Sequence, residues 1–200
     1  MAHREWAVCF AGLPLSRSKV IKVSIMDGPN STKPLGRVAS LHLHPREPGQ
    51  PLSRVDCIEV VADKGIVADP RYFGRISQST GQPSRRQVSL IEREQINGHA
   101  AALGLEGIAP GAVRSNIETA GINLTALVGC HVAIGEAVLL FYEARTPCAK
   151  MDAICVGLRT LMGNGRQGVM AQVVKSGRIR VNDSIGPAKV EPVAQQLSPG

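Results

Sequence analysis

Short runs of apolar and β-branched residues, separated by turns, make up most of this chain. Runs of roughly four to eight such residues, ended by Gly, Pro, Asn or Asp, predict β-strands. The predicted strands lie at residues 18–26, 36–44, 55–62, 87–91, 112–118, 127–128, 132–134, 137–145, 168–174, 178–181 and 184–190. A hairpin around Ser176-Gly177 is expected to join two of them, 168–174 and 178–181.

Helical patterns are rare. Residues 92–103 form the best helical pattern, which Gly104 ends, and residues 155–162 fit a second, shorter helix. Many short strands with one or two short helices predict a mainly β (α+β) fold, a largely antiparallel barrel or sandwich.

Composition supports one domain of this kind. The 200 residues include 21 Gly and 13 Pro, which argue against a helix bundle, and 44% apolar with 20% charged residues is typical of a globular chain. We expect a poorly ordered leader over residues 1–17, a single domain over 18–190 and a tail over 191–200. The longest strong apolar run, Val138 to Tyr142, is too short to span a bilayer, so we expect no membrane partner and a cytoplasmic location.

The net charge of +7 raises the question of an anionic partner. Proteins that bind single-stranded nucleic acid stack bases on aromatic side chains, and this chain has one Trp, two Tyr and three Phe. No helix-turn-helix or zinc pattern is present either, so nucleic acid is not an expected partner. A small anionic or phosphorylated molecule needs only a few cations; the densest basic stretch holds Arg71, Arg75, Arg85 and Arg86.

Cys148 carries the most specific chemical signal. It follows an apolar strand that must end at Pro147, because proline cannot continue a strand ladder, and Arg145 and Lys150 lie close by on either side. Nearby cations favour the thiolate, which is a nucleophile and a metal ligand. The alternative from these residues alone is a small buried, inert cysteine. Cys155 is either a resolving thiol for Cys148 or a helix-packing residue.

Other features are weaker. His42 and His44 share one strand face, which we expect to be solvated rather than metal-binding, and Asp63, Asp69 and Asp183 are expected in turns. Gly163 to Arg166 is either a phosphate cradle or an ordinary turn. The irregular segment 65–84 contains Tyr72-Phe73-Gly74, which is either a lid over a pocket or a plug at one end of a barrel.

Several motifs, in one order along the chain, resemble the MOSC domain, the module named for the C-terminal region of molybdenum-cofactor sulfurases. They are Gly65 to Asp69, Arg86 to Ile91, Arg114-Ser115-Asn116-Ile117 with Gly121-Ile122, Arg145-Thr146-Pro147-Cys148, and Gly168 to Val174 with Gly177 and Asn182-Asp183. The resemblance covers roughly residues 35 to 187.

This resemblance implies a MOSC-type β-barrel in which Cys148 carries sulfur as a persulfide or binds the molybdenum of a molybdopterin cofactor. Arg86, Asn116 and Arg145 would hold the phosphate and the pterin edge, with Lys150 and Arg71 at the rim. Some relatives form the cofactor-binding part of reductases of N-hydroxylated compounds, so a cysteine desulfurase or a redox protein is an implied partner. The alternative is a non-catalytic module that binds a small anion or a partner and has an inert cysteine.

Overall fold

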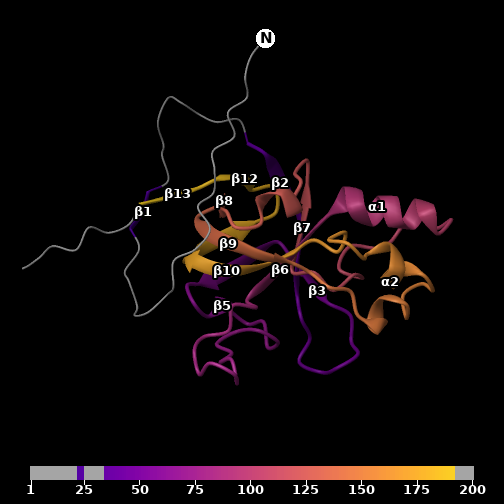
Figure 1. Cartoon of the computed structure of the whole chain (residues 1–200), viewed down its shortest axis with the longest axis horizontal. Helices are drawn as coiled ribbons and strands as arrows, with labels where there is room; N and C mark the ends of the chain where they lie inside the picture. Colours follow the sequence, from indigo (N-terminus) through magenta and orange to yellow (C-terminus); the bar gives the residue numbers. More distant parts are fainter. Residues whose placement is uncertain (1–21, 25–33, 192–200) are drawn as a thin grey trace, which may run out of the picture.

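The computed structural model describes residues 22–24 and 34–191, and strands make up most of it (Figure 1). The predicted leader over 1–17 lies outside the described residues, as do most of the predicted strand 18–26 and nearly all of the predicted tail 191–200. The strands are β1 (Lys22–Ser24), β2 (Gly36–Leu43), β3 (Ser53–Val55), β4 (Cys57–Val61), β5 (Gly65–Ile66), β6 (Val88–Glu92), β7 (Ile117–Ala120), β8 (His131–Ile134), β9 (Ala137–Ala144), β10 (Val169–Lys175), β11 (Gly177–Arg180), β12 (Ser184–Pro187) and β13 (Lys189–Glu191). The helices are α1 (Arg93–Ala102) and α2 (Leu158–Leu161), with 3-10 turns η1 (Thr125–Leu127) and η2 (Ala149–Met151).

Seven strands close into a barrel in the order β12-β8-β9-β10-β6-β7-β2, and β12 pairs with β2 to complete the ring. All neighbours in the ring are antiparallel except β6 and β7, which run parallel with Leu90 opposite Ile117. Parallel neighbours need a crossover connection, and α1 supplies it. The prediction of a mainly β, largely antiparallel barrel with one or two short helices is therefore confirmed.

The expected hairpin at residues 168–181 is wrong. β10 pairs with β9 and β6 inside the barrel, whereas β11 pairs with β4, placing Ile179 opposite Ile58 in a separate three-stranded sheet with β5. Ile179 is buried in the main core, so burial rather than the local turn decides its partner. The predicted strand 55–62 likewise divides between β3 and β4, which belong to different sheets.

Two hydrophobic clusters stabilise the fold. The larger one contains side chains of the barrel strands and of the three-stranded sheet, and Phe141 of β9 is among its largest fully buried members. The smaller one joins the outside of the barrel to the helices, since Ile91 of β6 packs with Ile96 of α1 and with Leu158 of α2. Both helices therefore lie on the same side of the barrel (Figure 1).

Within the described ranges, no helix is long and apolar enough to cross a membrane.

Candidate functional site

The Cys148 segment leaves the barrel as predicted. β9 ends at Ala144, and Cys148 follows Pro147 in extended conformation just before the η2 turn. Its thiol is free and exposed, so the prediction of a presented rather than a buried cysteine holds. The thiol opens into a cavity of about 480 Å³, which we call the basic pocket. Its lining residues are Arg71, Tyr72, Arg86, Arg114, Glu143, Ala144, Arg145, Thr146, Pro147, Cys148, Lys150, Met151, Gln167 and Met170.

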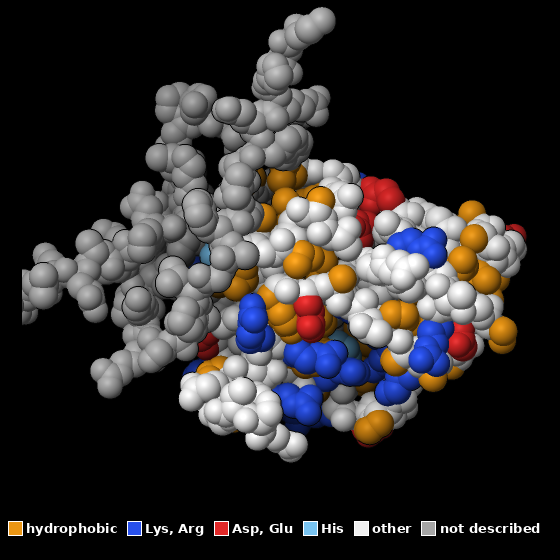
Figure 2. All heavy atoms as spheres, in the orientation of Figure 1, with side chains coloured by type: hydrophobic (Ala, Val, Ile, Leu, Met, Phe, Trp, Pro, Cys, Tyr) orange, Lys and Arg blue, Asp and Glu red, His pale blue; other side chains and the backbone are white. Residues whose placement is uncertain are grey.

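The basic pocket brings together five cations and one carboxylate. Arg71, Arg86, Arg145 and Lys150 were predicted from the sequence, and all four line it with Cys148. Figure 2 shows how Lys and Arg side chains gather on the lower half of the described surface. Such a surplus of fixed positive charge in a concave site concentrates anions.

Arg145 is the most firmly held of these cations. Its backbone amide donates to the Gly168 carbonyl at 2.8 Å, and its guanidinium donates to the carbonyls of Gln167 at 3.4 Å and Arg114 at 3.3 Å. Burial, together with the neighbouring arginines Arg71 and Arg86, lowers the pKa of Arg145 to about 10, and Tyr72 and Cys148 oppose the shift. Arg145 is therefore charged at neutral pH and fixed in place.

Arg114, which was not among the predicted site residues, is a second anchored cation. Its Nη1 donates to the Gln50 carbonyl at 3.0 Å, and burial lowers the pKa of its guanidinium, with Arg71 adding to the effect. Its Nε is buried and has no partner among the described residues, and neither does the Oε1 of Gln167 in the same pocket wall. A buried donor and a buried acceptor are thus available to a ligand. The left-handed backbone of Arg114, with φ of 57°, is not visible in the sequence.

Asn116 does not line the basic pocket. It is fully buried between β2 and β6, where its Nδ2 donates to Asp69 Oδ2 at 2.8 Å and to the His42 carbonyl at 3.2 Å, while its Oδ1 accepts from Ser89 Oγ at 2.8 Å. Because these partners occupy its amide, the structure gives Asn116 a scaffolding position behind the pocket instead of the predicted contact with a pterin edge.

Asp69 is the centre of this buried network. Its Oδ2 also bonds with His44 Nδ1 at 2.9 Å, and its Oδ1 accepts the backbone amide of Arg71 at 2.9 Å. Burial alone would raise the pKa of Asp69, but the hydrogen bonds from His44 and from the Arg71 backbone outweigh it and lower the pKa. Tyr72, the next residue, is buried, and its ring packs edge-on against the His44 ring with the two ring centroids 5.4 Å apart. The network therefore fixes the loop that carries Arg71 and Tyr72 into the pocket wall.

The prediction of a solvated His42 and His44 face is wrong. Both side chains are buried, because the segments around Gly111 and Asp69 cover the outer face of β2. Burial is the main cause that lowers the pKa of His42, whose ring nitrogens have no hydrogen-bond partner among the described side chains and backbone groups. In the described ranges, no three His, Cys, Asp or Glu side chains lie close enough together to hold a metal ion.

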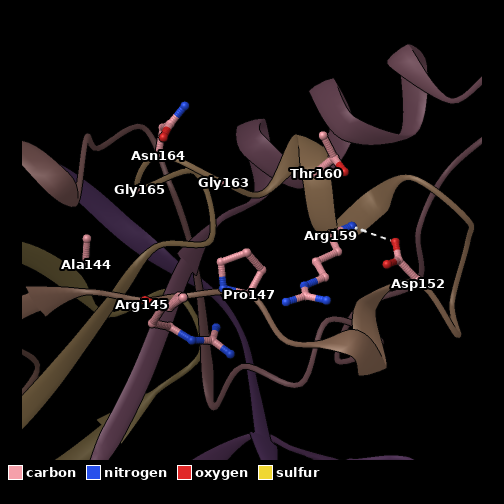
Figure 3. A pocket seen from close by; sticks show the side chains of 10 residues that line it. Ala144, Arg145, Pro147, Asp152, Arg159, Thr160, Gly163, Asn164 and Gly165 are labelled. Atoms are coloured by element: carbon pink, nitrogen blue, oxygen red, sulfur yellow. Dashed lines mark hydrogen bonds between the residues drawn. The ribbon is translucent and has the colours of Figure 1, made fainter.

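A second, more open cavity of about 620 Å³ adjoins the basic pocket (Figure 3). It shares Ala144, Arg145, Thr146 and Pro147 with the basic pocket. Its other lining residues are Asp152, Arg159, Thr160, Gly163, Asn164 and Gly165, so the predicted glycine turn lies at its rim.

The other thiols among the described residues, those of Cys57, Cys130 and Cys155, do not line the basic pocket. Cys155 is half-buried, and its amide donates to the Met151 carbonyl at 3.3 Å within the chain that follows Cys148. A resolving role for Cys155 stays a prediction. Cys57 is exposed on β4.

Comparison with known proteins gives one family. A family model described as the MOSC domain matches residues 74–186. No curated protein matches the chain. Among solved structures, the chain is similar to the YuaD protein of Bacillus subtilis, with a TM-score of 0.64 and 19% identity over 78% of this chain and 97% of that one. It is also similar to YiiM from Escherichia coli, with a TM-score of 0.53 and 19% identity over 78% and 69% of the two chains. YiiM from Geobacillus stearothermophilus gives a TM-score of 0.52 and 15% identity over 78% and 73%.

Proposed function

Because the chain belongs to the MOSC domain family, we propose that its basic pocket binds a small phosphorylated cofactor of the molybdopterin type and that Cys148 is the group that reacts there, as a molybdenum ligand or as a persulfide sulfur carrier. The observation that carries this proposal is the position of Cys148: an exposed thiol in the wall of a cavity with five cations and one carboxylate.

The residues present fit such a group. A volume of about 480 Å³ lies within the usual range of ligand pockets, roughly 300–1,000 Å³. The unpartnered Arg114 Nε and Gln167 Oε1 are a donor and an acceptor that match the mixed edge of a pterin ring. A thiolate is soft enough to ligate molybdenum, which would supply the redox chemistry when bound.

The chain's own residues have distinct tasks in this proposal. Arg145 and Arg114 are planar forks whose guanidinium groups are held by backbone carbonyls, so they suit phosphate oxygens that need a fixed partner. Arg71, Arg86 and Lys150 are exposed cations that attract the anion and close around it. All five place positive charge in the wall of the cavity that holds Cys148, where it would stabilise an anionic ligand.

A cytoplasmic setting, in which thiols stay reduced, fits a free reactive cysteine. Sulfur loading needs a donor such as a cysteine desulfurase, and a reductase of N-hydroxylated compounds needs a redox partner; both are proposed partners of this chain.

Metal and pterin analysis tests the proposal. Protein purified from a host that makes molybdopterin should contain molybdenum and pterin, and R114A should retain at most about a tenth of both, because one charged hydrogen-bonded contact contributes on the order of 1.5–3 kcal/mol. R178A is the control, since Arg178 is an exposed arginine of β11 that lines neither cavity. Wild-type protein free of metal, pterin and releasable sulfur would favour the inert binding module.

A further inference from the structure

The second cavity, which we call the Arg159 cavity, contains charged groups that the proposed function does not use. Arg159 belongs to α2, and its guanidinium lies beside Pro147, with the guanidinium of Arg145 below the same ring in this view (Figure 3). No hydrogen bond or ion pair joins the Arg159 guanidinium to another described residue. A cation that faces a cavity without a partner is available to a ligand carboxylate.

Asp152 supplies the opposite charge in the same cavity. Its Oδ1 accepts the backbone amides of Gly157 at 3.1 Å and Arg159 at 3.0 Å, which fixes the carboxylate at the start of α2 (Figure 3). Its Oδ2 makes no hydrogen bond with the described residues, so it can accept one from a ligand. The hydroxyl of Thr160 adds a neutral polar group to the wall.

One unpartnered cation and one unpartnered carboxylate oxygen select a zwitterion. A free phosphate would be repelled by Asp152, and a simple cation by Arg159. We propose that the Arg159 cavity binds the head group of an α-amino acid, with the carboxylate on Arg159 and the ammonium on Asp152. The side chain of that amino acid then points to Pro147, one of the residues at which the cavity meets the basic pocket that Cys148 lines.

An amino acid bound in this way could donate sulfur to Cys148. This step rests on the proposed function, in which Cys148 accepts sulfur. The donor class is an α-amino-acid persulfide, such as cysteine persulfide. The Cys148 thiolate attacks the outer sulfur, a new S–S bond forms at Cys148, and the S–S bond of the donor breaks. The donor's inner sulfur leaves as the cysteine thiolate with the bonding electron pair, so no further oxidant or reductant is consumed.

Three donors that differ only in the head group test the inference. Cysteine persulfide has both charges, cysteamine persulfide lacks the carboxylate, and 3-mercaptopropionate persulfide lacks the ammonium. Wild-type protein should load sulfur on Cys148 from cysteine persulfide at least about tenfold faster, at subsaturating donor, than from either analogue. R159A should remove the preference over cysteamine persulfide, and D152N the preference over 3-mercaptopropionate persulfide. The D152N side chain keeps an oxygen for the two backbone amides, and R178A is the charge-matched control.

Equal loading from all three donors by wild-type protein would overturn the inference, as would a preference that R159A and D152N leave intact. Calorimetry with S-methylcysteine, which cannot transfer sulfur, separates this failure from that of the proposed function. If the compound binds wild-type protein at least about tenfold more tightly than R159A while Cys148 loads from no donor, the amino-acid site stands and the sulfur-carrier role fails. If it binds both proteins alike, the amino-acid site fails whatever Cys148 does.

Discussion

Serine at position 148 is expected to abolish sulfur loading. Wild-type protein incubated with a persulfide donor and freed of excess reagent should release about one equivalent of sulfur to cyanide, and C148S should release none. The reason is chemical: a serine hydroxyl stays protonated at neutral pH and cannot form a persulfide, whereas the cavity and its five cations are unchanged.

C57S is the matched control for this experiment. Cys57 is the other exposed cysteine among the described residues, and it lies on β4 outside both cavities. C57S should retain the wild-type amount of cyanide-releasable sulfur. If sulfur release persists in C148S, or disappears in C57S, a thiol outside the basic pocket carries the sulfur.

Replacing Asp69, which does not line the basic pocket, is expected to destabilise the fold and to weaken ligand binding in that pocket. D69A should lower the free energy of unfolding by about 3 kcal/mol or more, because it leaves His44 and Asn116 with buried polar groups that have lost their partner. It also releases the Arg71 amide, so the loop with Arg71 and Tyr72 loses its attachment. Urea unfolding measures the first effect, and weaker binding of the molybdopterin cofactor measures the second.

Lowering the pH should also show how much the stability of the fold depends on the Asp69 carboxylate. The pKa of Asp69 is lowered in the folded protein, so its stabilising effect is present above the ordinary value of 3.8 and is lost as the pH falls through the lower folded value. D69A should therefore lose less stability than wild type over that acid range. D56A is the control, since Asp56 is exposed and its side chain makes no hydrogen bond with the described residues. Equal stability of D69A and D56A would contradict the scaffolding role.

Much of the fold was predictable because it depends on local signals. Apolar runs ended by Gly or Pro mark the barrel strands, and Gly104 marks the end of the best helix. The exit of Cys148 from the sheet follows from Pro147 alone. The pairing of β11 with β4 was not predictable, since the two strands are far apart in sequence and only the shared core brings Ile179 to Ile58.

The site was predictable where charge and sequence neighbourhood suffice, as for Cys148, Arg145 and Lys150. Arg114 was missed because its contribution depends on a left-handed backbone and a buried Nε. Asn116 was expected at a ligand, yet Asp69, distant in sequence, occupies its amide. His42 and His44 alternate with leucines, as polar residues on a solvated strand face do. Only the structure shows that the segments around Gly111 and Asp69 cover this face.

The charge selectivity of alkylation tests whether Cys148 is a reactive thiol in an anion-binding pocket. Iodoacetate and iodoacetamide differ in charge and share the same leaving group, and mass spectrometry reads Cys148 and Cys57 in the same sample. The ratio of the iodoacetate rate to the iodoacetamide rate should be about tenfold higher at Cys148 than at Cys57, and it should fall at about 1 M salt, where charges are screened. Equal ratios at the two thiols, unaffected by salt, would show that the pocket around Cys148 does not concentrate anions.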